Sequence, residues 1–187
     1  MANYNFKAFR ILVVDDSASI RQLIHSTLDI IGVGHVEVAA HGGEAVEIIK
    51  KSAKPLSNRL MQPGGSSFDI VMTNMDMPTV DGMMLLRWIR RHEESPDRFL
   101  PVIMVSSYAD PAKVRDARDA GVTEFVAKPF TISSICSRLI NAIERPRQFV
   151  QTATYFGPDR RRRSLPYDGE NRRMLTDDSP EVELISD

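Results

Sequence analysis

The stretch FDIVMTNMDMPTVDG, residues 68–82, decides the fold of this chain. Its apolar residues 70–72 predict a buried strand, and the polar Asn74 stands at the end of that strand. A Met-Pro turn follows at 77–78, and the Asp-Gly pair at 81–82 is typical of a helix start. In open sheets covered by helices, the carboxyl ends of the strands carry the binding groups. The stretch therefore predicts a functional loop that begins at Asn74.

Short apolar runs alternate with helical patterns on both sides of this stretch. Strands are predicted at residues 11–14, 36–39, 70–73, 102–105 and 125–127, and helices at 17–31, 43–50, 82–91, 111–120 and 132–143. Continuous apolar strands separated by helices are typical of a parallel sheet with helices on both faces. The predicted fold class is therefore α/β, a doubly wound, five-stranded parallel sheet of the (βα)5 type.

Two regions lie outside this pattern. Residues 52–67 are rich in Pro, Gly and Ser and predict an inserted surface loop. Residues 146–187 contain four prolines, many charges and little apolar periodicity, so we expect a mostly disordered tail. The chain is thus divided into a domain at 9–145 and a flexible tail, which is arginine-rich at 157–173 and acidic at 174–187.

The composition is that of a globular protein. The chain has 187 residues, 42% of them hydrophobic, and a formal net charge of −1. The single cysteine, Cys136, excludes an internal disulfide and is expected to be a buried helix residue. No apolar run approaches the roughly 20 residues of a membrane span, and the first residues lack a signal-peptide pattern. We therefore expect a cytoplasmic protein without membrane insertion.

Polar side chains also follow the other predicted strands. Asp15 and Asp16 come directly after the first strand, Ser106 follows the fourth, and Lys128 follows the fifth, where a cis bond to Pro129 is expected. Adjacent carboxylates need a cation nearby, and oxygen ligands of this kind suit Mg²⁺. The serine hydroxyl can bond a phosphoryl oxygen, and the lysine can neutralise the pocket. The simpler alternative is a buried ion cluster that only holds the strand ends together.

Together with Asn74, the turn at 77–78 and the Asp-Gly at 81–82, these residues closely resemble, in order and spacing, the receiver domain of two-component response regulators. The resemblance covers about residues 10–145. It implies a flavodoxin-like fold and a function in phosphorelay signal transduction.

The resemblance also implies roles for single residues. Asp16 and the residue at the tip of the third strand would bind Mg²⁺, together with the backbone carbonyl of Asp76. Ser106 and Lys128 would contact the phosphoryl group. Ser106 and Phe125 would form the switch pair that reports phosphorylation to the face made by the fourth strand and its neighbours.

Asn74 departs from the family, in which an aspartate accepts the phosphate at this position. An amide nitrogen is not a nucleophile at neutral pH, so the covalent step should be blocked. Asp76 lies two residues beyond the strand tip and is not expected to replace it. The affinity for Mg²⁺ should also fall, to weak binding by Asp15 and Asp16, because one anionic ligand becomes neutral. Either a natural receiver that has lost phosphorylation or an engineered one would carry this asparagine.

Arginine dominates the first part of the tail. Residues 145–173 contain eight arginines and three acids, and the pattern GPDRR at 157–161 recurs as GENRR at 169–173. An aromatic residue shortly precedes each copy, which favours a duplicated binding element. Guanidinium groups chelate phosphates and stack on purine rings. The tail is therefore either a solvated, charge-balanced segment or an anion-recognition segment.

The sequence YFGPDRRRR at 155–163 is similar to the arginine-rich extension of CheY-like cyclic-di-GMP effectors. This resemblance nominates as ligand-binding residues Asp159, Arg160, Arg161, Arg162, Arg163, Arg172 and Arg173. A nucleic acid is a less favoured partner, because the acidic end adjoins the arginines and the sequence predicts no recognition helix.

Three functions are thus compared. The favoured one is a receiver that docks to a target protein, such as the flagellar motor, and has no enzymatic output. If residue 74 were aspartate, a histidine kinase or phosphotransfer protein would gate it. The alternative is a phosphorylation-independent cyclic-di-GMP effector gated by the tail. An enzyme is disfavoured, because the sequence shows neither a phosphate-binding glycine loop after the first strand nor a nucleophile–base pair. We expect a monomer or weak dimer.

Overall fold

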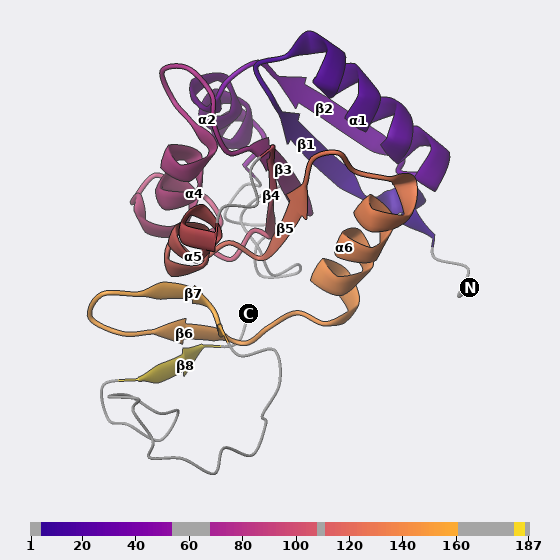
Figure 1. Ribbon diagram of the computed structural model, residues 1–187. Helices are drawn as coiled ribbons and strands as arrows, with labels where there is room; N and C mark the ends of the chain where they lie inside the picture. Colours follow the sequence, from indigo (N-terminus) through magenta and orange to yellow (C-terminus); the bar gives the residue numbers. More distant parts are fainter. Residues whose placement is uncertain (1–4, 54–67, 108–110, 161–181, 186–187) are drawn as a thin grey trace.

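The computed structural model describes residues 5–53, 68–107, 111–160 and 182–185 (Figure 1). Its central sheet is parallel and has the strand order β2-β1-β3-β4-β5. These strands are β1 (Arg10–Val14), β2 (His35–Ala39), β3 (Ile70–Asn74), β4 (Val102–Ser106) and β5 (Glu124–Ala127). The described helices are the 3-10 turn η1 (Phe6–Ala8), α1 (Ala18–Ile31), α2 (Gly42–Lys51), α4 (Gly82–Arg91), α5 (Pro111–Asp119) and α6 (Ile132–Glu144).

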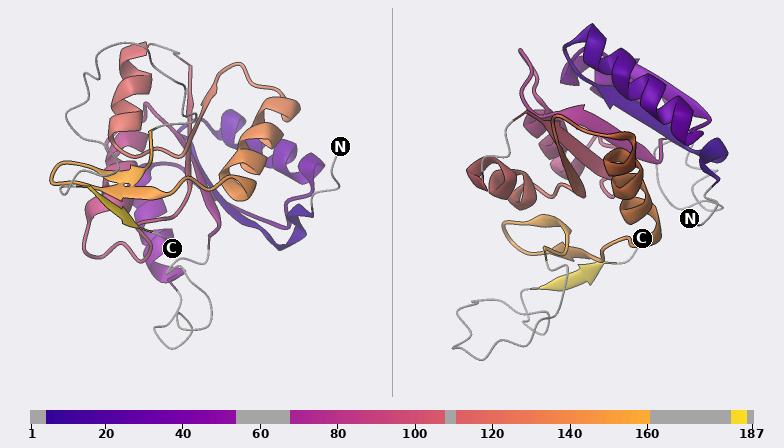
Figure 2. Two further views of the ribbon diagram at one scale, coloured as in Figure 1. Left: turned by 90° about the horizontal axis from the view of Figure 1, so that it is seen from below. Right: turned by 45° about the vertical axis from the view of Figure 1, so that its right-hand side comes forward.

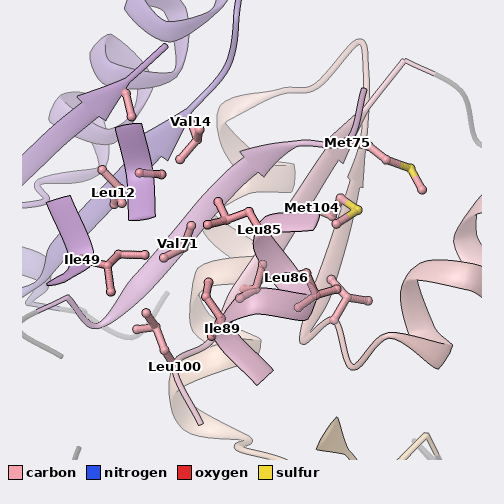
Figure 3. Packing of buried hydrophobic residues seen from close by; sticks show 14 of the residues in the cluster. Leu12, Val14, Ile49, Val71, Met75, Leu85, Leu86, Ile89, Leu100 and Met104 are labelled. Carbon is pink, nitrogen blue, oxygen red and sulfur yellow. The ribbon is translucent and has the colours of Figure 1, made fainter. Parts of the chain in front are cut away.

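Helices cover both faces of this sheet, with α1 and α6 on one side and α2, α4 and α5 on the other (Figure 1). Alternate strand residues point to opposite faces, so each face has its own apolar cluster. Figure 3 shows the cluster beneath α2 and α4, where Leu85, Leu86 and Ile89 pack against the strands. β1, β3 and β4 are buried almost throughout, as their continuous apolar sequences require.

The predicted fold class is confirmed. Each predicted strand and helix of the domain is present, and its ends differ from the prediction by at most one residue. These elements were readable because their apolar patterns are local and strong. Most of the predicted surface loop at 52–67 lies outside the described residues, as do residues 161–181 and 186–187 of the tail.

The start of the tail differs from the prediction. Where the sequence suggests a mostly disordered segment, residues 146–160 are described and form two strands, β6 (Phe149–Gln151) and β7 (Phe156–Pro158). Together with β8 (Glu183–Ile185) they make a small antiparallel sheet of order β7-β6-β8, which Figure 2 shows beside the main domain. Strands of three residues are too short to show a period of two in the sequence, which is why they were missed.

Aromatic burial attaches this small sheet to the domain. The rings of Phe149 and Phe156 lie 5.0 and 5.5 Å from that of Phe99, which stands in the loop before β4. The backbones of Gly157 and Gly121 also touch: a β-carbon on Gly157 would come within 2.7 Å of the Cα of Gly121. The first part of the tail therefore packs on the domain at the amino ends of β4 and β5.

A buried arginine organises this end of the molecule. The side chain of Arg90, at the end of α4, is 0% exposed. Its guanidinium donates to the carbonyls of Arg98, Leu100 and Gly121 at 2.8–3.0 Å and lies 5.3 Å from the ring centroid of Phe149. Buried carbonyls need such donors, so Arg90 joins the loops before β4 and β5 to the aromatic cluster.

Candidate functional site

The predicted site residues meet at the carboxyl ends of the parallel strands. Asp15 directly follows β1, Asn74 ends β3, Ser106 ends β4 and Lys128 directly follows β5. The register places Asn74 opposite Val105 on the neighbouring strand, one residue before Ser106. The sequence thus correctly predicted that these side chains share one edge of the sheet.

An ion pair forms the floor of the site. The ammonium of Lys128 lies 2.9 Å from Oδ2 of Asp15, whose side chain is 1% exposed. The other carboxylate oxygen of Asp15 accepts the backbone N–H of Ser17 at 2.9 Å. A buried carboxylate is tolerated only when it is paired and hydrogen-bonded in this way. Both carboxylate oxygens of Asp15 therefore already have partners within the site.

The amide of Asn74 closes the site. Its Nδ2 donates to Oδ1 of Asp16 at 3.0 Å and to the backbone carbonyl of Asp76 at 2.8 Å, while its Oδ1 accepts from Lys128 at 3.3 Å. A carboxylate in this position could not make the first two bonds, because an ionised carboxylate only accepts. The amide N–H groups thus link the two oxygen atoms that the resemblance assigned to Mg²⁺.

Arg21 is a site residue that the sequence analysis missed. Its guanidinium donates to the backbone carbonyls of Asp15 and Asp16 at 2.6 and 3.2 Å. Arg21 lies on α1, one turn after the cap Ser17, and therefore fixes the loop that carries both aspartates. The i+5 and i+6 spacing could have suggested this contact, but only if the loop geometry had been known.

The oxygen donors around Asn74 are those that a hard divalent cation prefers. They are the carboxylate of Asp16, the carbonyl of Asp76 and the side-chain oxygen of Asn74, which here faces Lys128 while Nδ2 faces the other two. Within the described ranges, no three His, Cys, Asp or Glu side chains are grouped so that they alone could hold a metal ion. The residues present would therefore fit Mg²⁺ once the Asn74 amide turns its oxygen toward Asp16 and Asp76, with one anionic ligand fewer than an aspartate at position 74 would provide.

The loop after Asn74 is closed by tight backbone packing. Gly82 cannot carry a side chain, because a β-carbon there would lie 2.1 Å from the carbonyl oxygen of Asn74. The N–H of Gly82 donates to the carbonyl of Met75 at 3.0 Å, and Thr79 has a positive φ of 66°. Asp81 caps α4, as predicted, by accepting the N–H of Met84 at 2.7 Å. The glycine and the cap together hold the loop against the strand tip.

The predicted switch residues lie on adjacent strands. Ser106 is fully buried at the end of β4, and its carbonyl accepts the N–H of Lys128 at 2.7 Å. Phe125 is half-buried on β5, packed against the cluster that faces α4 and α5. The Lys128–Pro129 bond is cis, as predicted.

The two predicted tail residues that the structure describes, Asp159 and Arg160, do not join this site. Arg160 instead forms an ion pair with Asp119 at the end of α5, 2.9 Å apart, and its guanidinium lies 4.3 Å from the ring centroid of Tyr155. The backbone carbonyl of Asp159 accepts from Arg147 at 3.0 Å. These contacts lie near the amino ends of β4 and β5, away from the strand tips. The remaining predicted ligand residues, Arg161, Arg162, Arg163, Arg172 and Arg173, lie outside the described residues.

Burial changes the acidity of one tail residue. Tyr155 donates its hydroxyl proton to the carbonyl of Pro158 at 2.7 Å. Desolvation raises the pKa of Tyr155, and the nearby positive charge of Arg160 opposes this only in part. The phenol is therefore held neutral inside the folded tail.

Comparison with known proteins agrees with this geometry. The family model for the response regulator receiver domain matches residues 11–140. The chain belongs to the receiver family. It is 31% identical to the chemotaxis protein CheY-3 of Vibrio cholerae over 139 residues, which cover 74% of this chain and 95% of that protein. It is 32% identical to a CheY homologue of Campylobacter jejuni over 122 residues, which cover 65% and 82% of the two chains.

Solved receiver structures have the same fold. Those of Vibrio cholerae CheY4 and of the histidine kinase CKI1 receiver from Arabidopsis thaliana are each 28% identical to this receiver, with TM-scores of 0.57 and 0.58. They match 70% and 72% of this chain and 95% and 91% of their own. The CKI1 receiver was crystallised with Mg²⁺ and BeF₃⁻. The family model ends at residue 140, so the sheet formed by β6, β7 and β8 lies beyond it.

Proposed function

We propose that this receiver signals by docking to a partner protein, without phosphorylation at position 74 and without an enzymatic activity of its own. The observation that carries the proposal is the double hydrogen bond from Nδ2 of Asn74 to Asp16 and to the carbonyl of Asp76. It gives the strand tip a closed arrangement that needs neither a metal nor a phosphoryl group. A receiver whose strand tip is closed in this way would keep one conformation of its docking surface until an input other than phosphorylation changes it.

The site residues would then have different roles from those of a phosphorylated receiver. Lys128 remains paired with Asp15 and holds the ends of β5 and β1 together. Asp16, Asn74 and the carbonyl of Asp76 would hold Mg²⁺ weakly, and the ion when bound would supply positive charge beside Asn74. Ser106 would have no phosphoryl oxygen to bond, so the Ser106–Phe125 pair would not be driven between two states.

The docking surface proposed for this receiver is the one formed by α5, β5 and α6. A related receiver, CheY of Borrelia burgdorferi, was crystallised in complex with CheX, BeF₃⁻ and Mg²⁺; it is 25% identical to this chain with a TM-score of 0.57. For this protein the partner class is a target protein, such as a component of the flagellar motor. A histidine kinase or phosphotransfer protein would be a partner only of a form with aspartate at position 74. Among the described residues, no helix is long and apolar enough to span a membrane.

Labelling with a small phosphodonor tests this proposal. The wild-type chain should take up no acid-labile phosphate in the presence of Mg²⁺, whereas Asn74→Asp should become labelled, because Ser106 and Lys128 are already placed beside position 74. Asn74→Ala is the matched control, since it also lacks the amide but provides no nucleophile. Phosphate uptake by the wild-type chain would refute the blocked site, and an unlabelled Asn74→Asp would refute the assignment of the strand tip.

The second candidate function is that of a cyclic-di-GMP effector. It is favoured by the arginine-rich sequence and by Arg160, whose half-exposed guanidinium binds a carboxylate and lies over the ring of Tyr155. The test is calorimetric titration of cyclic-di-GMP into the full-length chain and into a chain that ends after Arg160. This shorter chain keeps Phe149 and Phe156, so it retains the aromatic cluster that a chain ending at Arg145 would lose.

Binding to the full-length chain alone would support the effector function. In that case, replacing both Arg160 and Arg161 by alanine should abolish binding and leave the fold unchanged. Absence of binding to either chain would remove this candidate and leave the docking receiver.

A further inference from the structure

Helix α5 contacts both the candidate site and the start of the arginine-rich segment. At its first turn, the ammonium of Lys113 lies 2.7 and 2.9 Å from the two carboxylate oxygens of Asp76. Asp76 is also the residue whose carbonyl accepts the Asn74 amide. One end of α5 is therefore joined by an ion pair to the loop that carries the candidate cation ligands.

The other end of α5 is joined to the tail. Asp119, its last residue, pairs with the guanidinium of Arg160 at 2.9 Å, and Arg118 donates to the carbonyl of Arg160 at 3.4 Å. Just beyond the helix, Gly121 packs against the backbone of Gly157. Arg160 is the first of the four consecutive arginines at 160–163, so this contact attaches the start of that run to α5.

Between these two ends, α5 is held by little apolar burial. Of its nine residues, only Ala117 is buried. Helices in proteins are held in place mainly by their apolar faces, so a helix with one buried residue can shift more easily than its neighbours. The ion pairs at its two ends consequently have a larger share in setting its position.

A cation at the site would compete with Lys113. An ion held by Asp16 and the carbonyl of Asp76 would bind the same residue whose carboxylate now accepts from the lysine ammonium. Two cations held by one residue repel each other. Cation binding should therefore loosen the Lys113–Asp76 pair and with it the first turn of α5.

We propose that α5 couples the candidate cation site to Arg160, so that cation binding loosens the Arg160–Asp119 contact and loss of that contact strengthens cation binding. The second half follows from the first by thermodynamic reciprocity. The proposal rests on the Mg²⁺ site of the proposed function. It runs through Lys113 and Asp119, and so needs neither phosphorylation nor the Ser106–Phe125 pair. Because both ion pairs are half-exposed, the coupling should change affinities by roughly two- to fivefold.

Amide hydrogen exchange on the full-length chain tests the connection without any ligand. The variants are Lys113→Met, Arg160→Met and the double variant, which remove charge but keep much of the side-chain length. Arg98→Met is the matched control: the guanidinium of Arg98 lies 3.4 Å from the ring centroid of Phe156 in the same part of the molecule, and Arg98 contacts Phe156 and Arg90, which lie outside α5. Arg160→Met should speed exchange along α5 as far as Lys113, by about twofold or more, and Arg98→Met should not. An effect confined to residues 118–121, or an equal effect of Arg98→Met, would overturn the coupling.

Mg²⁺ titration followed by amide chemical shifts tests the cation half. Lys113→Met and Arg160→Met should each lower the dissociation constant, and the double variant should bind no tighter than Lys113→Met. Additive effects would show two independent sites of action and would overturn the proposal. If the amides of Asp16 and Asp76 do not shift with Mg²⁺ in any variant, the cation site of the proposed function fails, whereas the exchange result still decides whether α5 joins the two ends.

Discussion

Replacing Asn74 by aspartate should convert a site that is stable without a metal into one that needs Mg²⁺. The substitution removes two hydrogen bonds, to Oδ1 of Asp16 and to the carbonyl of Asp76. The bond to the charged Asp16 contributes about 1.5–3 kcal/mol and the bond to the neutral carbonyl about 0.5–1.5 kcal/mol. The new carboxylate would also lie about 3 Å from Asp16, where two like charges repel by roughly 1.4 kcal/mol even in bulk water.

Two effects reduce this sum. Lys128, 3.3 Å from Oδ1 of Asn74, gains a second anionic partner, and the exposed Asp16 can turn toward solvent. We therefore expect Asn74→Asp to lose about 2–4 kcal/mol of unfolding free energy in EDTA. For a chain of this length, that corresponds to a melting temperature lower by about 5–15 °C. Mg²⁺ at about 100 times its dissociation constant should restore about 2.7 kcal/mol.

Thermal and urea unfolding with EDTA or with Mg²⁺ measure this difference, and Asn74→Ala separates its causes. The alanine variant loses the same hydrogen bonds without adding charge, so it should be destabilised in EDTA and gain little from Mg²⁺. The wild-type chain should also gain little from Mg²⁺. The reasoning is refuted if Asn74→Asp is as stable as the wild-type chain in EDTA, or if Mg²⁺ stabilises all three proteins equally.

Three further outcomes follow from the packing. Arg90→Met should lower the unfolding free energy measured by urea titration by about 3–5 kcal/mol, because it leaves buried carbonyls without donors. The control Arg91→Met, which changes an exposed neighbour, should cost less than about 1 kcal/mol. Equal effects of the two substitutions would contradict the role of Arg90. Gly82→Ala should reduce the expression of folded protein or lower its melting temperature by more than about 5 °C, because a β-carbon would collide with the carbonyl of Asn74. An unchanged melting temperature would contradict this expectation. Since the folded state raises the pKa of Tyr155, the unfolded chain loses that proton first, and stability should fall as pH rises above about 10. Urea titrations at several alkaline pH values should show a smaller fall for Tyr155→Phe, and an identical pH profile would show that this tyrosine does not contribute.

The site was predictable because its residues are marked locally. Each of Asp15, Asn74, Ser106 and Lys128 stands directly at the end of an apolar run, and parallel strands bring such ends to one edge. Their mutual bonds were not predictable. Asn74 donates to Asp16 and accepts from Lys128, and both partners depend on where the loops after β1 and β5 lie.

The sequence by itself determined the sheet, the order of strands and helices, and the edge at which the polar groups gather, because apolar periodicity and strand-end chemistry are properties of neighbouring residues. Only the tertiary structure decided where residues 146–160 pack, since Phe149 and Phe156 become a core only beside Phe99, some 50 residues earlier in the chain. The same holds for the ion pairs at the two ends of α5. Each pair joins residues that lie far apart in sequence, 37 positions in the case of Lys113 and Asp76. A charged residue shows no preference for one distant partner until the fold places the two within about 4 Å.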